Sequence, residues 1–219
     1  MRAAALSFPS SRSAVAAGIC AGLWLTQAGS VAAFTATLSP ASPQTVYLQI
    51  GVGSFTSTYS QGGQPANNTT VNNETVSVPA SAVGNGTAQA MTTNSTQTVS
   101  FWDNYSYCSV PGQLYIGGFY RTTGATTSVA RVIAAVPASL ADSTGDTIPF
   151  SSIQWTSSGN GDSGTEPFPA ATFGSGTMTV GSMASNTWNE SCWSFSYTNK
   201  SVRPAGTYTG VVTYTLSAP

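Results

Sequence analysis

The C-terminal segment "RPAGTYTGVVTYTLSAP" (Arg203–Pro219) carries the clearest strand pattern in the chain. Successive side chains of a β-strand point to opposite faces of its sheet. The pattern therefore predicts a half-buried antiparallel strand with one core face and one face toward solvent or a partner. The core set is Tyr208, Gly210, Val212, Tyr214 and Leu216, and the opposite set is Thr207, Thr209, Val211, Thr213 and Thr215.

Strand patterns separated by turn residues fill the rest of the chain, and no long amphipathic helix pattern occurs. We predict an all-β fold, an antiparallel two-sheet sandwich of Ig-like or Greek-key type with about eight to ten strands. One or two helical turns also fit Pro137–Asp142, and a short helix is the alternative for Thr127–Val136. The other predicted strands are Thr45–Val52, Glu74–Val78, Thr96–Asp103, Gln113–Arg121, Thr127–Val136, Ile148–Thr156, Gly176–Val180 and Cys192–Thr198.

The first 33 residues have the features of a signal peptide. Two arginines precede the apolar stretch Ala14–Leu25, and Val31–Ala33 supplies small residues before Phe34. The apolar stretch is shorter than the roughly 20 residues of a transmembrane helix. An uncleaved anchor or a lipid attached at Cys20 is the alternative. We therefore predict a signal peptide over residues 1–33 and a single β-sandwich domain over residues 34–219.

Charged residues are scarce in the predicted mature chain, which keeps four cations and seven anions for a net charge of −3. Nucleic-acid binding and binding to anionic membranes both need clustered Lys and Arg, so neither is expected. We expect no membrane insertion of the mature chain and a secreted, periplasmic or cell-surface location. The expected partners are other protein subunits or a cell-surface glycan.

Two cysteines remain after cleavage, Cys108 and Cys192, and an exported chain with an even number predicts one disulfide. Such a bond would bring together aromatic residues that lie near each cysteine. They form either a core around the bridge or a platform on which a sugar stacks, with Trp102 and Trp188 as the candidates for exposure. The two groups are Phe101, Trp102, Tyr105 and Tyr107, and Trp188, Trp193, Phe195 and Tyr197.

The chain contains no histidine, which excludes Ser-His-Asp and Cys-His catalysis and histidine-ligated metals. Asp142 and Asp146, like Asp162 and Glu166, lie in stretches rich in Gly, Ser and Thr that are typical of solvated turns. A calcium site at Asn160, Asp162 and Glu166, or a hydrolase using the last two, is the weaker alternative. We predict a non-enzymatic protein without cofactor or metal.

The segment "FTATL" directly follows the predicted cleavage position. Phe34, Ala36 and Leu38 share one parity of this alternating stretch, so they would lie on one face of a strand. A strand at a chain terminus can be added to the sheet of a second subunit. These three residues are therefore candidates for strand exchange.

The stretch "CWSFSY" together with the C-terminal segment resembles the end of WxL-type bacterial surface domains. Trp193-Ser194-Phe195 stands where that family has its Trp-x-Leu motif, and "IPFSSIQW" (Ile148–Trp155) is similar to its upstream strand. The same ending also resembles spore-coat-U-like and fimbrial subunits, whose exposed strands are completed by a neighbouring subunit.

These resemblances, with the composition, imply a secreted, non-enzymatic bacterial surface or fibre-type structural subunit. The alternative is a carbohydrate-binding or cell-wall-binding module that uses exposed aromatic residues.

Overall fold

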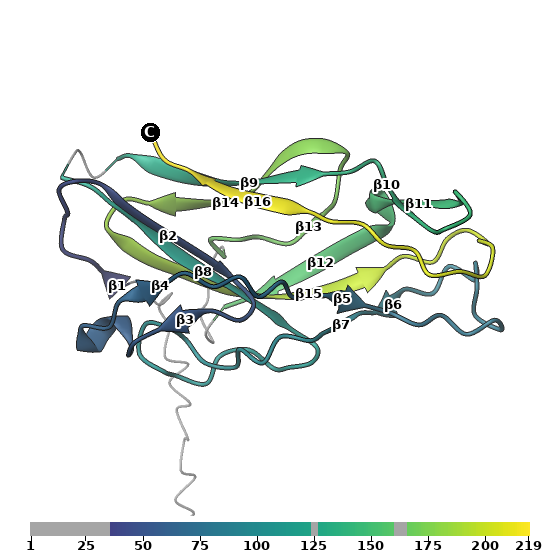
Figure 1. Ribbon diagram of the computed structural model, residues 1–219, viewed down its shortest axis with the longest axis horizontal. Helices are drawn as coiled ribbons and strands as arrows, with labels where there is room; N and C mark the ends of the chain where they lie inside the picture. Colours follow the sequence, from purple (N-terminus) through teal and green to yellow (C-terminus); the bar gives the residue numbers. More distant parts are fainter. Residues whose placement is uncertain (1–35, 124–126, 160–165) are drawn as a thin grey trace, which may run out of the picture. The chain divides into compact units, whose positions relative to one another are not determined.

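The computed structural model describes residues 36–123, 127–159 and 166–219 (Figure 1). The predicted signal peptide and Phe34 lie outside the described residues. In the described part, the helical elements are two short 3₁₀ turns, η1 (Tyr59–Gln61) and η2 (Phe150–Ser152), and everything else that is regular is β-strand. No helix in that part has the length and apolar character to cross a membrane. The all-β prediction is confirmed.

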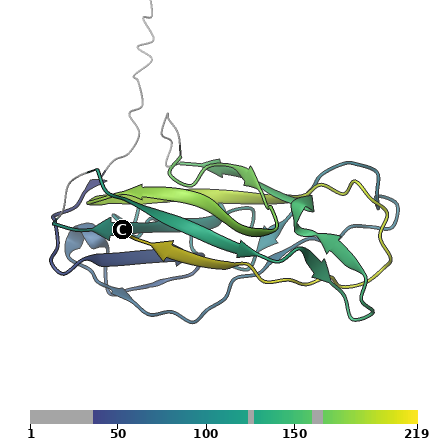
Figure 2. The same cartoon turned by 90° about the horizontal axis from the view of Figure 1, so that it is seen from above.

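Two antiparallel sheets form the body of the fold (Figures 1 and 2). The larger sheet has the order β13 (Ala171–Thr172), β12 (Ile153–Ser158), β15 (Thr187–Tyr197), β8 (Leu114–Arg121) and β2 (Thr45–Ile50), with β1 (Ala36–Thr37) and β6 (Gln89–Ala90) also paired to β15. The smaller sheet has the order β14 (Gly176–Ala184), β9 (Val129–Val136) and β16 (Thr213–Ser217). Short hairpins pair β3 (Ser54–Phe55) with β4 (Pro65–Ala66), β5 (Glu74–Thr75) with β7 (Thr92–Thr93), and β10 (Ser139–Ala141) with β11 (Thr147–Pro149).

The main core lies between these two sheets. Alternate residues of β9 are buried, among them Val132 and Ala134, and they face Trp193 and Phe195 of β15. The strict alternation of buried residues explains why Thr127–Val136 forms a strand rather than a helix. Trp155 of β12 fills the centre, with its ring 5.3 Å from that of Trp193.

The outer face of the larger sheet is covered as well, so this sheet is the middle of three layers. In β8, every residue from Leu114 to Tyr120 is buried, which requires cover on both faces. The residues between β2 and β8 supply the cover, except around β6, which joins the larger sheet itself, and they run below that sheet in Figure 1. We call this segment, residues 51–113, the loop layer.

Strand β16 is shorter than the C-terminal strand that we predicted. It begins at Thr213, and the residues before it contribute only an isolated bridge between Thr209 and Ala141. The predicted faces are confirmed, because Tyr214 and Leu216 are half-buried against the main core and Thr215 is exposed. Among the described strands, β16 pairs with β9 alone and is therefore an edge of the smaller sheet.

Three other predictions about local structure were wrong. Thr96–Asp103 is not a strand, because the Ser100 Oγ and Asp103 Oδ1 atoms accept the backbone N–H groups of Trp102 and Tyr105 and thereby hold a turn. Pro137–Asp142 contains strand β10 instead of a helical turn. Ile148–Thr156 is divided by η2 into β11 and β12.

The predicted disulfide between Cys108 and Cys192 is confirmed. It joins the loop layer to the centre of β15, and both cysteines are buried beside Tyr115. The bond therefore fastens the covering layer to the strand that has the most partners in the larger sheet.

We predict that the double variant Cys108→Ala, Cys192→Ala loses about 4–5 kcal/mol of unfolding free energy, because the bond spans 84 residues and restricts the unfolded chain. Urea unfolding of the variant and the parent measures the loss. Equal unfolding midpoints at an equal slope would contradict the prediction. The variant is preferred to chemical reduction, since the buried sulfurs are shielded from a reductant.

Candidate functional site

A cluster of aromatic rings fills the space between the larger sheet and the loop layer. Tyr47, Phe119 and Trp188 rise from β2, β8 and β15 and are buried there. The loop layer places Phe55, Tyr59, Phe101 and Trp102 over them, all half-buried. The predicted meeting of the aromatic residues near the two cysteines occurs in part. The Trp102 and Trp188 rings lie 5.9 Å apart, whereas Trp193 and Phe195 lie in the main core on the opposite face of the larger sheet.

The two tryptophans expected to be exposed differ in their surroundings. Trp188 is only 2% exposed, so the expectation of exposure is wrong for this residue. The physical reason is that the outer face of β15 is covered by the loop layer, whereas the polar neighbours in the sequence suggested an open surface. Trp102 is half-buried, and its ring stacks on Tyr59 at 5.6 Å.

Glu190 is the buried charge of this layer, 6% exposed beneath the loop layer. Its Oε2 atom accepts hydrogen bonds from Ser100 Oγ at 2.9 Å, Tyr115 Oη at 3.0 Å and Trp188 Nε1 at 3.0 Å. Burial raises the pKa of the carboxyl above its ordinary value, and these three donors only partly offset that rise. The negative charge of Asp103 raises it further.

Strand β8 contains the glycine pair Gly117-Gly118, and Gly117 packs closely beside Glu190. Gly117 lies opposite Glu190 in the register of β8 and β15. A Cβ atom at this position would collide with the Tyr115 hydroxyl. The absence of a side chain at Gly117 therefore leaves room for the hydrogen bond from Tyr115 to Glu190.

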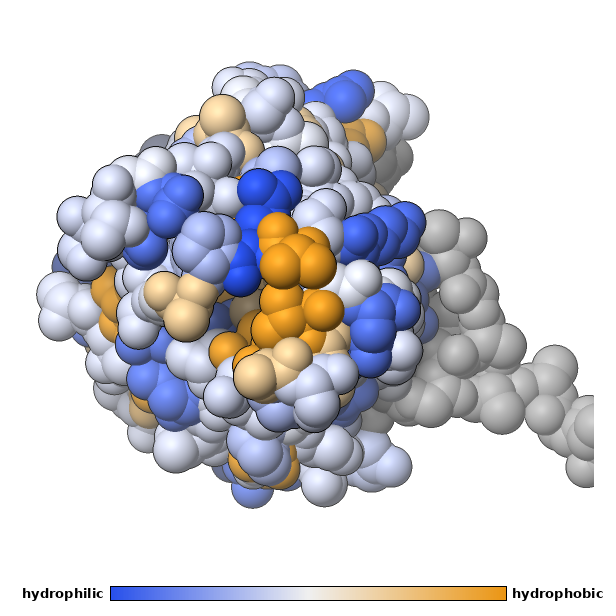
Figure 3. Space-filling view, turned by 90° about the vertical axis from the view of Figure 1, so that its right-hand side faces the viewer, coloured by the Kyte–Doolittle hydropathy of each residue, from blue (hydrophilic) through white to orange (hydrophobic). Residues whose placement is uncertain are grey.

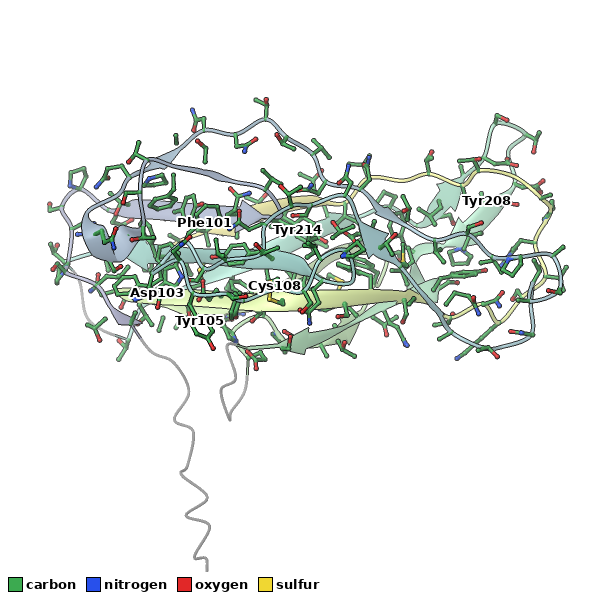
Figure 4. The ribbon with its side chains drawn as sticks, turned by 90° about the horizontal axis from the view of Figure 1, so that it is seen from below. Phe101, Asp103, Tyr105, Cys108, Tyr208 and Tyr214 are labelled. Atoms are coloured by element: carbon green, nitrogen blue, oxygen red, sulfur yellow. A yellow bond between two sulfur atoms is a disulfide. The ribbon has the colours of Figure 1, made fainter. Side chains whose placement is uncertain are left out.

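A pocket of about 490 Å³ opens in the loop layer beside the aromatic cluster. It lies between two segments, 55–61 and 97–104, and each forms one wall. Figure 4, drawn from the side of this layer, shows Phe101, Asp103 and Tyr105 near Cys108. The polar lining consists mainly of Ser57, Thr58 and Gln61 on the first wall and Gln97, Asp103 and Asn104 on the second.

The two walls of the pocket are bonded to each other. The backbone N–H of Tyr59 donates to the Phe101 carbonyl, and that of Ser60 donates to the Trp102 carbonyl, each at 2.9 Å. Ser100 then ties the second wall to the sheet, because its hydroxyl donates to Glu190. Backbone and buried side-chain hydrogen bonds therefore fix the positions of the two walls.

The candidates for strand exchange lie in the same layer. Ala36 pairs with Trp188, and the N–H of Leu38 donates to the Asn186 carbonyl at 2.9 Å. Ala36 and Leu38 are buried in the aromatic cluster, at 7% and 3% exposure, on the face that the alternation predicts. Phe34 lies outside the described residues. In the structure, this segment pairs with strand β15 of its own chain.

The acidic residues weighed in the sequence form no metal centre in the described part of the chain. Asp142 caps the turn between β10 and β11, where its Oδ1 atom accepts the N–H groups of Thr144 and Asp146. Asn160 and Asp162, the candidates for calcium binding or hydrolysis, lie outside the described residues. Glu166 alone of that set is described, half-buried near Gly159.

Hydrophobic atoms gather at the end of the molecule where β15 connects to β16 (Figure 3). Val202 lies in that connection and is 77% exposed, and its side chain borders Gly84 of the loop layer. None of these residues lines the pocket. The patch is therefore a second, separate surface feature.

No family model, curated protein or solved structure matches this chain. The resemblance to WxL-type domains and fimbrial subunits stays a prediction.

Sequence reasoning missed Glu190 and the pocket. Glu190 has the same parity as Trp188 and Cys192, so extending the predicted strand Cys192–Thr198 toward the N-terminus would have placed it on a covered face. The pocket has no comparable signal, because Gln61 and Gln97 meet only through the packing of the loop layer.

We predict that Glu190→Gln changes how stability depends on pH. A carboxyl whose pKa is higher in the folded state contributes most below its unfolded pKa, and its contribution falls as pH rises through the folded pKa. A glutamine cannot ionise, so the variant does not lose this contribution as pH rises. From about pH 4 to pH 8, the unfolding free energy of the variant should therefore increase relative to that of the parent, by about 1.4 kcal/mol for each unit by which the folded pKa is raised.

Urea unfolding of the variant and the parent at both pH values checks this, since the other carboxyl groups are common to the two proteins. A difference between them that is independent of pH, or that moves in the parent's favour, would show that Glu190 carries no raised pKa.

Proposed function

We propose that this chain is an exported, non-enzymatic bacterial surface or fibre-type structural subunit that assembles by exchange of its N-terminal arm. The observation that carries the proposal is the docking of that arm. The arm consists of Phe34–Leu38, and in the folded chain its described residues bury two apolar side chains through only two residue pairs with β15. The same docking site can accept the arm of a second copy.

The connection between the arm and β2 favours exchange. It is the short stretch Ser39–Gln44, which contains Pro40 and Pro43. Prolines restrict the backbone to extended conformations, and a short, stiff hinge favours domain swapping. Arg121 holds the start of this hinge, with its Nε atom donating to the Ser39 carbonyl at 2.7 Å. An exchanged arm can keep that contact.

Two surfaces support contact between subunits. Strands β2 and β16 end their sheets and carry no charged residue, although edge strands that avoid association commonly carry one. The second surface is the end of the molecule where Figure 3 shows hydrophobic atoms, near the connection that contains the exposed Val202, and exposed apolar patches commonly mark interaction sites. A secreted or cell-surface location accords with the disulfide, which persists in oxidising compartments.

We predict that deleting residues 34–38 from the mature protein leaves it folded but monomeric, whereas the intact protein forms oligomers. The main core contains neither Ala36 nor Leu38, so it survives the deletion. Size-exclusion chromatography with light scattering measures the assembly state. A synthetic peptide with the sequence of residues 34–40 should bind the shortened protein and raise its Tm in proportion to the peptide concentration.

A matched pair of peptides gives the control. Leu38→Asp in the peptide should abolish binding, because this side chain is buried, while Thr37→Asp should retain it, because Thr37 is exposed. An intact protein that stays monomeric at all concentrations, together with a shortened protein that ignores the peptide, would overturn the proposal.

A further inference from the structure

We propose that the pocket between residues 55–61 and 97–104 is a binding site for a neutral saccharide. Its volume of about 490 Å³ lies within the range of about 300–1,000 Å³ found for small-ligand sites, which suits a mono- or disaccharide. This inference goes beyond the structural role, because no residue of the N-terminal arm lines the pocket. It also places the ligand against Phe55 and Phe101 rather than on Trp102 or Trp188.

The lining has the hydrogen-bonding character of a sugar. Hydroxyl and amide side chains both donate and accept, as sugar hydroxyls do, and Ser57, Thr58 and Gln61 present these groups from one wall. Gln97 and Asn104 face them from the other wall. The Gln97 Nε2 atom already donates to the Val99 carbonyl at 2.6 Å, which leaves its Oε1 atom to accept from a ligand.

Asp103 supplies the one carboxylate among the described lining residues. Its Oδ1 atom accepts the N–H of Tyr105 at 3.0 Å, which fixes the side chain. We assign the Oδ2 atom to the ligand, because hydrogen bonds from hydroxyls to a carboxylate are stronger than those between neutral groups. Asp103 is exposed, so its carboxylate lies within reach of solvent-borne ligands.

Aromatic rings give the pocket its apolar component. Phe55 and Phe101 both line it, and their rings stack with centroids 5.4 Å apart. A pyranose ring presents C–H groups on its faces, and these pack on aromatic side chains while the hydroxyls at the ring edge reach polar groups. Two aromatic rings within a polar lining therefore match the amphipathic character of a sugar.

The charge of the pocket selects against anionic ligands. No lysine or arginine is among its described lining residues, and Asp103 would repel a phosphate, sulfate or uronic acid. A metal ion is equally unsuited, because one exposed carboxylate does not make a coordination site. A neutral polyhydroxylated ligand is the class that the lining satisfies.

The pocket is preformed, which lowers the entropy that binding must overcome. The Ser100 N–H donates to the Tyr105 carbonyl at 2.8 Å, and the Asn104 N–H donates to the Ser100 carbonyl at 3.0 Å. Asn104 has a left-handed backbone with φ of 67°, which asparagine tolerates better than most residues. These bonds hold the second wall in its turn before any ligand arrives.

The test uses the mature, disulfide-bonded protein and isothermal titration with four neutral disaccharides: cellobiose, diacetylchitobiose, maltose and mannobiose. A sulfated disaccharide serves as the anionic probe. Binding of at least one neutral probe is expected, with Asp103→Asn at least about tenfold weaker, because a charge-assisted hydrogen bond is lost. Ser57→Phe, which fills the pocket, should abolish binding.

Matched controls separate the site from the rest of the surface. Asp146→Asn makes the same charge change near Tyr208, at the other end of the molecule (Figure 4), and Ser60→Phe adds the same ring beside the pocket but outside its lining. Both should bind like the parent.

Near-ultraviolet circular dichroism confirms that each variant is folded. Failure of all four neutral probes, preference for the sulfated probe, or equal affinities of Asp103→Asn and Asp146→Asn would overturn the proposal. Because the arm-deleted protein keeps the pocket residues, titrating it too shows whether binding survives when assembly is lost.

Discussion

The structure depends on covering both faces of one strand. Along β15, Trp193 and Phe195 face the smaller sheet, while Trp188, Glu190 and Cys192 face the loop layer. A two-layer sandwich would leave the second group in water, so the residues between β2 and β8 form a third layer over it. Glu190 makes this cover more necessary, because a buried carboxylate needs hydrogen-bond donors. Ser100 of the loop layer supplies one of these donors.

The fold class followed from local patterns. Alternation over residues 129–136 and 213–217 determines which side chains are buried, and local alternation is visible in sequence. The disulfide was predictable from the expected export of the chain and from the two cysteines that remain after the predicted cleavage. The loop layer was not, because its strands are two residues long and its shape comes from Asx-type turns and tertiary hydrogen bonds that follow no period.

The candidate site was only partly accessible to the same reasoning. Both tryptophans were expected to be exposed, but Trp102 is half-buried and Trp188 is buried, since their exposure depends on a layer that the sequence pattern does not reveal. Most polar residues that line the pocket are Ser, Thr, Gln and Asn, and these residue types are common throughout the sequence. What distinguishes them is that the backbones of Tyr59 and Phe101 are hydrogen-bonded across a separation that no local window spans.

The central position of β15 has a consequence for the order of folding during synthesis. Strand β15 pairs with β1, β6, β8 and β12, which all precede it in the chain. These strands therefore lack their common partner until residue 197 has been synthesised. Cys192 is made equally late and cannot bond to Cys108 before then. The central contacts of the larger sheet therefore form only when synthesis is nearly complete, and contacts of such long range are slow to form.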